Sequence, residues 1–243
     1  TVIAAVEEQL AEGGAPIAID YTESRAEEPR PRWLTLRVAS LGRRGRVALM
    51  LHDDSPRRWA EQATLGHNRV LEAIARGDRL EGVLEELVRF VEDQVPGSRC
   101  SVLLRRGDVL RQCAGAHIPA GYVEELGDVP IGPGIGCCGT AAHLAEPVIV
   151  ADIDTDPLWA AFRHLAAKYE LRSCWSVPLL SSGTRRVLGT FALYRSVPGN
   201  PSDEIMRALS NQFGVVHPFA EMVESLSLGE QDMQTLGVPC STL

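Results

Sequence analysis

A glycine-rich turn followed by two apolar runs is the feature that most restricts what this sequence can fold into. The turn and a short helix signal cover Gly134–Ala142, and buried strands are expected over Pro147–Ala151 and Ser173–Leu180. Between these strands, Asp156 and Pro157 predict a helix start, because an acidic N-cap accepts a free backbone N–H and proline fits the first helical position. This order of elements predicts the floor and one wall of a small-molecule pocket.

The remaining segments alternate between the two-residue period of strands and the longer period of helices. The expected strands cover residues 16–22, 32–40, 46–52, 100–105, 109–113 and 187–194, and the expected helices cover residues 2–12, 56–76, 78–95, 140–144, the segment from 157 to 169, and the segment that starts at Asn200. Helix 78–95 is expected to begin with a capping box formed by Asp78 and Glu81. Its core face is predicted to consist of Leu80, Val83, Leu84, Leu87, Val88 and Val91. In the segment from 157, the core stripe is predicted to be Leu158, Phe162, Leu165 and Tyr169.

Helix 56–76 has small and apolar residues at alternating steps of four and three. They are Trp59, Ala63, Gly66, Val70, Ala73 and Gly77. Such spacing is typical of a two-stranded seam, which would make the chain a homodimer through its helices. It is equally typical of a single amphipathic helix packed on its own domain. The sequence leaves both interpretations open.

The composition excludes several classes of function. A formal net charge of −8 argues against a nucleic-acid partner, because binding to phosphates needs a basic surface. No apolar run reaches the ~18 residues of a membrane helix, so no membrane partner is expected. The 6 cysteines form no CxxC pair and no disulfide framework, which predicts a reducing, cytoplasmic location.

Five ordered motifs resemble those of GAF domains of the bacterial sensor type. They are Gly132–Ala142, Pro147–Ile153, Asp156–Trp159, Leu171–Leu179 and Val187–Tyr194. The resemblance implies an α+β fold in which an antiparallel sheet of about five or six strands has helices on one face and a ligand cavity on the other. It places the GAF domain at residues 78–225, followed by a tail at 226–243.

The first quarter of the chain resembles the C-terminal half of a PAS sensor domain. The likeness lies in the strand Arg32–Val38, the following hairpin, and the exit through His52–Ser55 into a helix. It implies a helix and a three-strand antiparallel sheet over residues 1–55. Residues 56–77 then form a linker helix between the two domains.

Candidate ligand-binding residues follow from the pocket motifs. Trp159 and Trp175 are expected either to wall an apolar cavity or to belong to the plain core. Arg163 and Arg172 are the candidates to bind the negative end of a ligand. The complete set of expected ligand-binding residues is Trp159, Arg163, Trp175, Cys138, Thr140, Asp152 and Arg172.

Cys138 lies where the glycine turn meets its helix. A thiol at a helix N-terminus can be stabilised as the reactive thiolate, while the alternative is a small buried apolar residue. The run Cys138–Ala141 resembles an element of the free methionine sulfoxide reductases, which are GAF domains. The further cysteine of those enzymes has no match here, since Cys174 lies on a later strand.

Three functions remain open from the sequence. The first is a non-catalytic sensory module of a histidine kinase or a cyclic-di-GMP enzyme, which binds an unidentified small molecule and signals through flanking helices to an output domain outside this chain. The second is a structural dimerisation module without ligand, and the third is a reductase of free methionine-R-sulfoxide. No metal site is expected, because the residues show no tetrahedral zinc or calcium-loop spacing, and the cofactor is left unknown.

Overall fold

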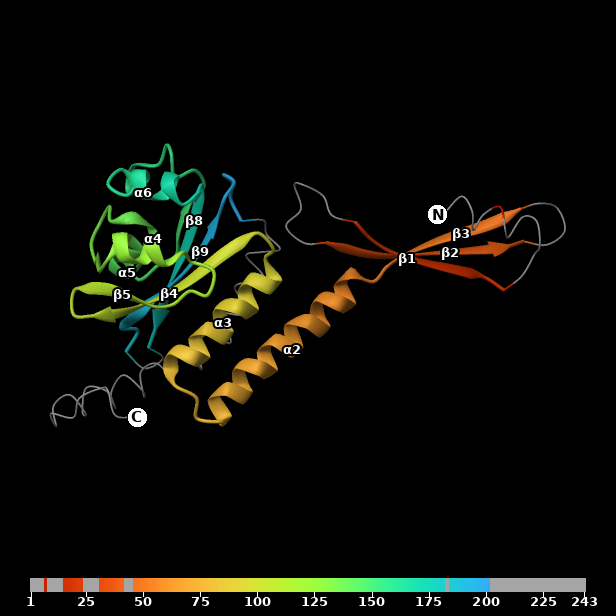
Figure 1. Ribbon diagram of the computed structural model, residues 1–243, viewed down its shortest axis with the longest axis horizontal. Coiled ribbons are helices and arrows are strands. Elements are labelled where there is room, and N and C mark those ends of the chain that lie inside the picture. The colour runs from red at the N-terminus through yellow and green to blue at the C-terminus, as the bar shows by residue number, and fades with distance from the viewer. Residues whose placement is uncertain (1–6, 8–14, 24–30, 42–45, 182–183, 202–243) are drawn as a thin grey trace. The chain divides into compact units, whose positions relative to one another are not determined.

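The computed structural model describes residues 7, 15–23, 31–41, 46–181 and 184–201, arranged as two compact units that divide at Asn68 and Arg69 (Figure 1). The helices expected over residues 2–12 and from Asn200 onward lie outside the described residues. No helix within the described ranges combines the length and the apolar character that crossing a membrane requires.

The first unit contains a three-stranded antiparallel sheet in the order β1-β2-β3. Its strands are β1 (Ile17–Glu23), β2 (Arg32–Ser40) and β3 (Val47–Asp53), each within one residue of the predicted bounds. Leu34 and Val38 of the central strand are buried, because side chains an even number of positions apart share one face of a sheet.

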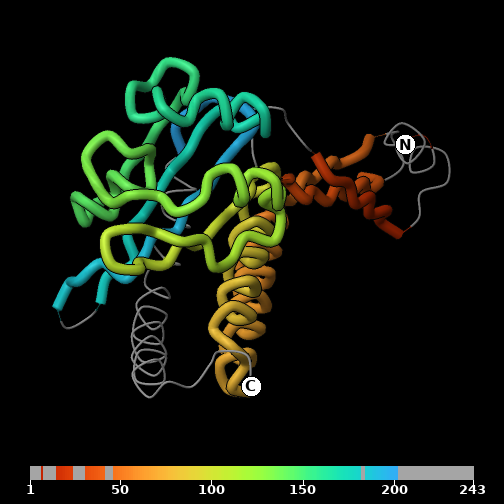
Figure 2. The backbone as a smooth tube through the Cα atoms, turned by 60° about the vertical axis from the view of Figure 1, so that its left-hand side comes forward, coloured from red at the N-terminus to blue at the C-terminus, as the bar shows by residue number. Residues whose placement is uncertain are grey.

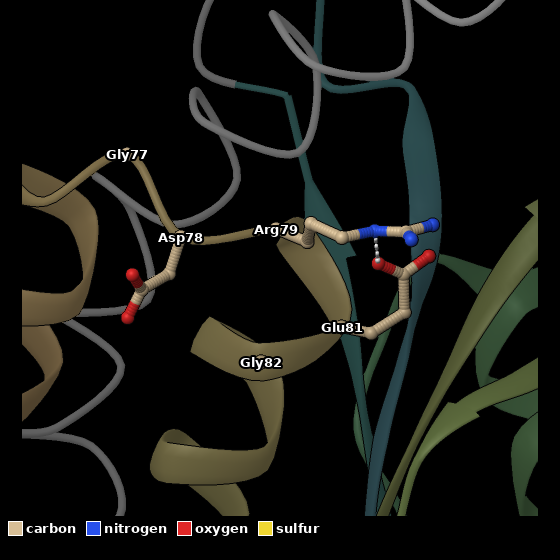
Figure 3. Close-up of a pocket in the computed structure, with 5 residues that line it drawn as sticks. All are labelled: Gly77, Asp78, Arg79, Glu81 and Gly82. Atoms are coloured by element: carbon tan, nitrogen blue, oxygen red, sulfur yellow. Dashed lines mark ion pairs between the residues drawn. The ribbon is translucent and has the colours of Figure 1, made fainter. Parts of the chain in front are cut away.

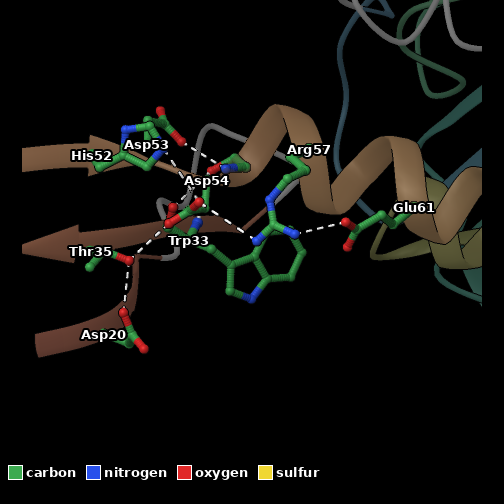
Figure 4. Close-up of polar contacts among 9 residues, drawn as sticks. Asp20, Trp33, Thr35, His52, Asp53, Asp54, Arg57 and Glu61 are labelled. Carbon is green, nitrogen blue, oxygen red and sulfur yellow. Dashed lines mark hydrogen bonds and ion pairs between the residues drawn. The ribbon is translucent and has the colours of Figure 1, made fainter. Parts of the chain in front are cut away.

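The exit from β3 into helix α2 (Ser55–Ala75) is held by polar contacts (Figure 4). The buried Ser55 hydroxyl accepts the backbone N–H of Trp33 at 2.8 Å, and the Ser55 N–H donates to Asp53 Oδ1 at 3.0 Å. Arg32 donates to the other Asp53 oxygen at 2.7 Å. The hydrogen bonds from Ser55 and Arg32 lower the pKa of Asp53 to about 2. The end of the sheet and the start of the helix are therefore joined through one carboxylate.

Two long helices confirm the predicted periodicity. Helix α2 matches the expected segment within one residue at each end, and in the second unit its Val70 and Ala73 are buried. Helix α3 (Leu80–Gln94) buries all six residues of its predicted core face. The expected capping box is wrong, because the N-cap of α3 is Arg79 and makes no side-chain cap bond. Asp78 instead pairs with Arg76 at 2.7 Å.

The second unit is built on a six-stranded antiparallel sheet in the order β6-β5-β4-β9-β8-β7. Its strands are β4 (Ser98–Arg106), β5 (Val109–Ala114), β6 (Val129–Pro130), β7 (Val148–Val150), β8 (Ser173–Leu180) and β9 (Val187–Arg195). The fold class expected from the sequence, α+β with an antiparallel sheet and flanking helices, is confirmed.

This sheet lies between α3 and a layer of shorter helices (Figures 1 and 2). The layer consists of α4 (Ala120–Leu126), α5 (Gly136–Leu144), the 3-10 turn η1 (Pro157–Trp159) and α6 (Arg163–Lys168). Its apolar residues pack in one cluster with Leu103, Cys174 and Tyr194 of the sheet, whereas α3 packs on β4 and β5 from the other side. The sheet therefore has a different helical partner on each face.

The segment after Asp156 is not the continuous helix that its spacing predicts. Asp156 does cap it, since its carboxylate accepts the Leu158 N–H at 2.9 Å, but the chain makes one 3-10 turn and restarts as a helix only at Arg163. The Arg163 side chain donates back to the carbonyls of Ile153 and Asp156, at 3.3 and 3.2 Å. Because of this break, Trp159 is buried while Leu158 is only half-buried.

Candidate ligand-binding site

A small cavity of about 20 Å³ lies between the sheet and the helical layer of the second unit. A space of this size accommodates about one water molecule, so side chains fill most of the region. Residues of α4, α5, η1 and the loops beside them cover the cavity, and strands β4, β6 and β9 complete it. The lining residues are Leu103, Tyr122, Leu126, Val129, Ile135, Gly136, Cys137, Cys138, Trp159, Phe162 and Tyr194.

Four aromatic rings form much of the cavity wall. Trp159 lies edge-to-face against Phe162 and Tyr194, with both centroid distances at 6.4 Å. Tyr122 meets Tyr194 at 6.1 Å in a similar geometry. Such edge-to-face contacts are the favoured arrangement of aromatic pairs. The Trp159 Nε1–H donates to Cys137 Sγ at 3.2 Å, which fixes the indole in the wall.

Helix α5 lies close to its neighbours because it contains a glycine where a side chain would clash. A Cβ atom at Gly139 would lie 2.5 Å from the carbonyl oxygen of Pro130. The close approach buries Cys137 and Cys138, and the Cys137 thiol donates to the carbonyl of Cys174 at 3.4 Å. The lack of a side chain at Gly139 thus lets α5 pack close to Pro130.

Of the two alternatives for Cys138, the structure favours the small buried residue over the reactive thiolate. Burial and, after it, the neighbouring Cys137 raise the pKa of Cys138, the hydroxyls of Ser176, Thr190 and Tyr194 lower it, and the net result is a pKa of about 11. Desolvation therefore outweighs the effect of the helix N-terminus. Cys138 is a protonated, buried residue in the cavity wall.

Trp175 does not share the cavity with Trp159. On β8, Cys174 belongs to the apolar cluster below the helical layer, and successive side chains of a strand point to opposite faces. Trp175 is absent from that cluster and from the cavity lining, and it pairs with Leu193 and Ile149. The structure therefore places it in the core on the face of the sheet where α3 lies.

The expected charged residues also lie outside the cavity lining. Arg172 forms ion pairs with Asp152 and Asp154, each at 3.2 Å. Arg163 donates to two backbone carbonyls, as described above. Both guanidinium groups are thus engaged in holding the loop after β7, and neither one provides a positive charge in the cavity. Thr140 is buried on α5 but does not line the cavity either.

Several wall residues were missed by sequence reasoning. Tyr122 and Leu126 come from α4, and Leu103 and Tyr194 come from the two central strands. The alternation of β9 indicates that Tyr194 shares a face with Ala192, but the sequence does not say which face the cavity is on.

The opposite side of the sheet is connected to the cavity wall through two carboxylates of α3. Glu92 accepts the backbone N–H of Cys100 at 2.7 Å, and its second oxygen pairs with His117 Nδ1. Glu85 accepts the backbone N–H of Gly115 at 2.9 Å. Residues 115 and 117 belong to the connection between β5 and α4, and α4 carries Tyr122 into the cavity wall. Helix α3 is therefore bonded to the segment that positions α4.

A second hollow, of about 720 Å³, is open to solvent at the turn between α2 and α3 (Figure 3). It is lined by Gly77, Asp78, Arg79, Glu81 and Gly82. Among the residues that the structure describes, Arg79 pairs with Glu81 at 3.7 Å. The charged side chains of this hollow are exposed, so it lacks the buried polar groups that a specific ligand site needs.

The described part of the chain contains no group of three or more histidine, cysteine or carboxylate side chains placed to hold a metal ion. Within the same part, none of the five cysteines forms a disulfide.

Comparison with known proteins agrees with this architecture. Residues 79–216 match the GAF domain model. The chain is 32% identical over 192 residues to the methyl sulfide methyltransferase-associated sensor of Methanosarcina acetivorans, a match that covers 77% of this chain and 19% of that protein. The chain thus spans about a fifth of the length of that relative.

Solved structures share the fold at low sequence identity. The free methionine-R-sulfoxide reductase of Neisseria meningitidis in complex with its substrate matches with a TM-score of 0.54 and 18% identity, covering 69% of this chain and 91% of that one. The GAF domain of an Acinetobacter phosphoenolpyruvate-protein phosphotransferase matches with a TM-score of 0.50 and 17% identity, covering 68% and 96% of the two chains. With the family match over more than half of its length, this chain belongs to the GAF domain family.

Proposed function

We propose that this chain is the sensory segment of a longer signalling protein, in which a small molecule bound in the GAF cavity biases the position of helix α3. Membership of the GAF family and the similarity to a protein named as a sensor support a sensory role. In this proposal the output module, of the histidine kinase or cyclic-di-GMP enzyme type, lies outside this chain. The first unit acts as a PAS-type half domain, and the chain forms a cytoplasmic homodimer through its helices.

The observation that carries the proposal is the bonded connection between the cavity wall and α3. Helix α4 contributes Tyr122 and Leu126 to the wall, and the segment that leads into α4 is held by Glu85 and Glu92 of α3. A shift of α4 must therefore either carry α3 with it or break these hydrogen bonds. A ligand transmits a signal only if it binds two arrangements of the protein with different affinities. The hydrogen bonds from α3 to the segment that leads into α4 link the position of α3 to the position of α4 in each arrangement.

The cavity enlarges more easily on the side of the helical layer. Leu126, Ile135 and Phe162 of the helical layer are half-buried, whereas Leu103 and Tyr194 of the sheet are buried. Half-buried side chains lose fewer contacts when they rotate away, so entry of a molecule larger than water displaces the helical layer rather than the sheet. The layer that moves is the one that contains α4.

The small volume of the cavity favours the second candidate function, a structural module whose pocket is packed shut. Reductase activity is disfavoured, because thiol chemistry requires a thiolate and burial raises the pKa of both Cys138 and Cys174.

A cavity-filling variant tests the proposal. Val129 lines the cavity, so Val129→Leu adds one methylene to a space of about 20 Å³. Val123→Leu is the matched control, because Val123 is a half-buried residue of α4 that packs on the same cluster without lining the cavity. Each protein is incubated with a defined mixture of small metabolites, and the molecules it retains are identified by mass spectrometry.

We expect the unmodified chain and Val123→Leu to retain the same molecule and Val129→Leu to lose it. Retention of no molecule by the unmodified chain would favour the structural module. Equal retention by Val129→Leu would place the binding site elsewhere.

A further inference from the structure

From the buried hydroxyl groups beside the cavity, we infer that the ligand is an uncharged molecule that joins an apolar or aromatic body to one hydrogen-bonding group. This inference rests on the proposed function and specifies the chemical class of its ligand. The apolar body would contact Trp159 and its neighbouring rings, and the polar group would bond to hydroxyls of the sheet.

Three buried hydroxyl side chains lie on the cavity-facing side of the sheet. Ser101 and Ser176 both pair with Ala192 of β9, from the strands on either side of it, and Thr190 lies two positions away on β9. Their exposed fractions are 1%, 0% and 0%, respectively. We name Ser101, Ser176 and Thr190 the hydroxyl floor.

The hydroxyl floor lies next to two residues of the cavity wall. Helix α5, which carries Cys138, packs on β8 and β9, the strands of Ser176 and Thr190. The hydroxyls of Ser176 and Thr190 lower the pKa of the Cys138 thiol, and that of Ser101 lowers the pKa of the Tyr194 phenol. Cys138 and Tyr194 both line the cavity, and Cys138 Sγ lies 3.9 Å from the Tyr194 hydroxyl. The hydroxyl floor therefore lies beneath the thiol and the phenol that line the cavity.

None of the three floor hydroxyls has a hydrogen-bond partner of good geometry among the described residues. Leaving a buried polar group unpaired costs about 1 to 3 kcal/mol, and the group beside Ser176 and Thr190 is the Cys138 thiol, which is a poor substitute for an oxygen partner. A ligand that brings one oxygen or nitrogen atom to this end of the cavity recovers part of that cost. Such a group adds specificity to contacts that are otherwise apolar.

The surroundings of the cavity select against a charged ligand. All eleven lining residues are uncharged. Arg172 is paired with Asp152 and Asp154, and Arg163 is bonded to backbone carbonyls outside the lining. Burying an ion without a partner costs far more than burying a hydroxyl, so a carboxylate or phosphate would remain in water.

Three ring compounds of similar size test the inference. Phenol supplies a ring with a hydroxyl, toluene supplies the ring without one, and benzoate adds a negative charge. Binding to the full chain is measured by isothermal titration calorimetry, and each ligand's effect on the melting temperature is measured in parallel. The variants are Thr190→Val, which removes a floor hydroxyl at nearly constant shape, and Thr64→Val, which makes the same change on the exposed surface of α2.

We expect phenol to bind more tightly than toluene, and benzoate not to bind. Thr190→Val should weaken the binding of phenol about threefold to tenfold, as expected for the loss of one hydrogen bond, and leave the affinity for toluene unchanged. Thr64→Val should leave the affinities for phenol and toluene unchanged. Thr190→Val should also fold normally, because it removes an unpaired hydroxyl, so its melting temperature without ligand serves as a check.

Benzoate binding as tight as phenol binding, or unchanged phenol affinity in Thr190→Val, would overturn the inference. If the metabolite retained in the mass-spectrometric experiment carries a carboxylate or phosphate, the inference fails while the proposed sensory function stands. If the unmodified chain retains no metabolite in the mass-spectrometric experiment and binds none of the three ring compounds, both the inference and the proposed sensory function fail.

Discussion

Replacing Glu92 by glutamine should loosen helix α4 without unfolding the sheet. The Glu92 side chain is 7% exposed, and its carboxylate accepts the Cys100 N–H while it pairs with His117. Glutamine keeps one oxygen for Cys100 but places an uncharged group opposite His117. Hydrogen bonds to charged groups contribute about 1.5 to 3 kcal/mol and neutral ones about 1 kcal/mol, so we expect a local loss of about 1 to 2 kcal/mol.

Hydrogen–deuterium exchange with mass spectrometry measures this loss where it occurs. A decrease of 1 to 2 kcal/mol in the free energy of local opening corresponds to about a fivefold to thirtyfold faster exchange. Peptides that cover residues 115–126 should show it, and peptides from β9 should not. Glu86→Gln is the matched control, because Glu86 lies on the same helix in an exposed pair with Arg89 that contributes at most about 0.5 kcal/mol.

Two results would refute the reasoning. If α4 exchanges at its original rate in Glu92→Gln, the carboxylate does not hold the segment that leads into α4. If exchange in β9 accelerates as much as exchange in α4, the substitution weakens the whole unit. Such a result gives no support for a specific connection between α3 and the cavity wall.

Three further predictions concern packing, thiol chemistry and acid stability. Gly139→Ala places a Cβ 2.5 Å from a backbone oxygen and should lower the free energy of unfolding by about 1 to 3 kcal/mol. Gly82→Ala, whose Cβ would have no atom within 4 Å, should not lower it. Urea denaturation compares the two variants, and equal stabilities would contradict the close approach of α5. Because burial raises the pKa of Cys138 to about 11, its thiol should resist iodoacetamide at pH 8 in the folded chain and react after denaturation. Mass spectrometry of the labelled peptides measures this, and rapid labelling of Cys138 in the folded chain would mean that the thiol is not buried. Asp53 has its folded pKa lowered from 3.8 to about 2, so its stabilisation of the β3–α2 junction is present above pH 4 and lost as the pH falls toward 2. After correction for the intrinsic exchange rate at each pH, protection of the junction amides should fall over this window in the unmodified chain but stay constant in Asp53→Asn, and parallel profiles would exclude this role.

The regular elements could be predicted from the sequence because local patterns determine them. Strands β2 and β8 have the predicted bounds, and the core face of α3 is the predicted one. The segment after Asp156 was predicted less well, because its spacing fits a continuous helix, whereas the chain breaks after one 3-10 turn and the Arg163 side chain bonds to the carbonyls of Ile153 and Asp156. Tertiary contacts therefore override local propensity there.

The candidate site could be predicted only in part. Trp159 lies in the cavity wall, but Trp175 points to the other face, because alternation fixes which residues of a strand share a face and not which face carries the helical layer. The engagement of Arg172 by Asp152 and Asp154, and the pairing of Glu92 with His117, both join residues distant in the chain. No spacing rule within one element predicts such contacts.

In the proposed function, a molecule in the cavity changes the position of α3 through α4. The most direct test compares hydrogen exchange in the ligand-free chain and in the chain saturated with phenol or with the metabolite it retains. We expect slower exchange in α4 and, across the sheet, in the part of α3 between Glu85 and Glu92. Slower exchange confined to the cavity-lining segments, with α3 unchanged, would contradict it.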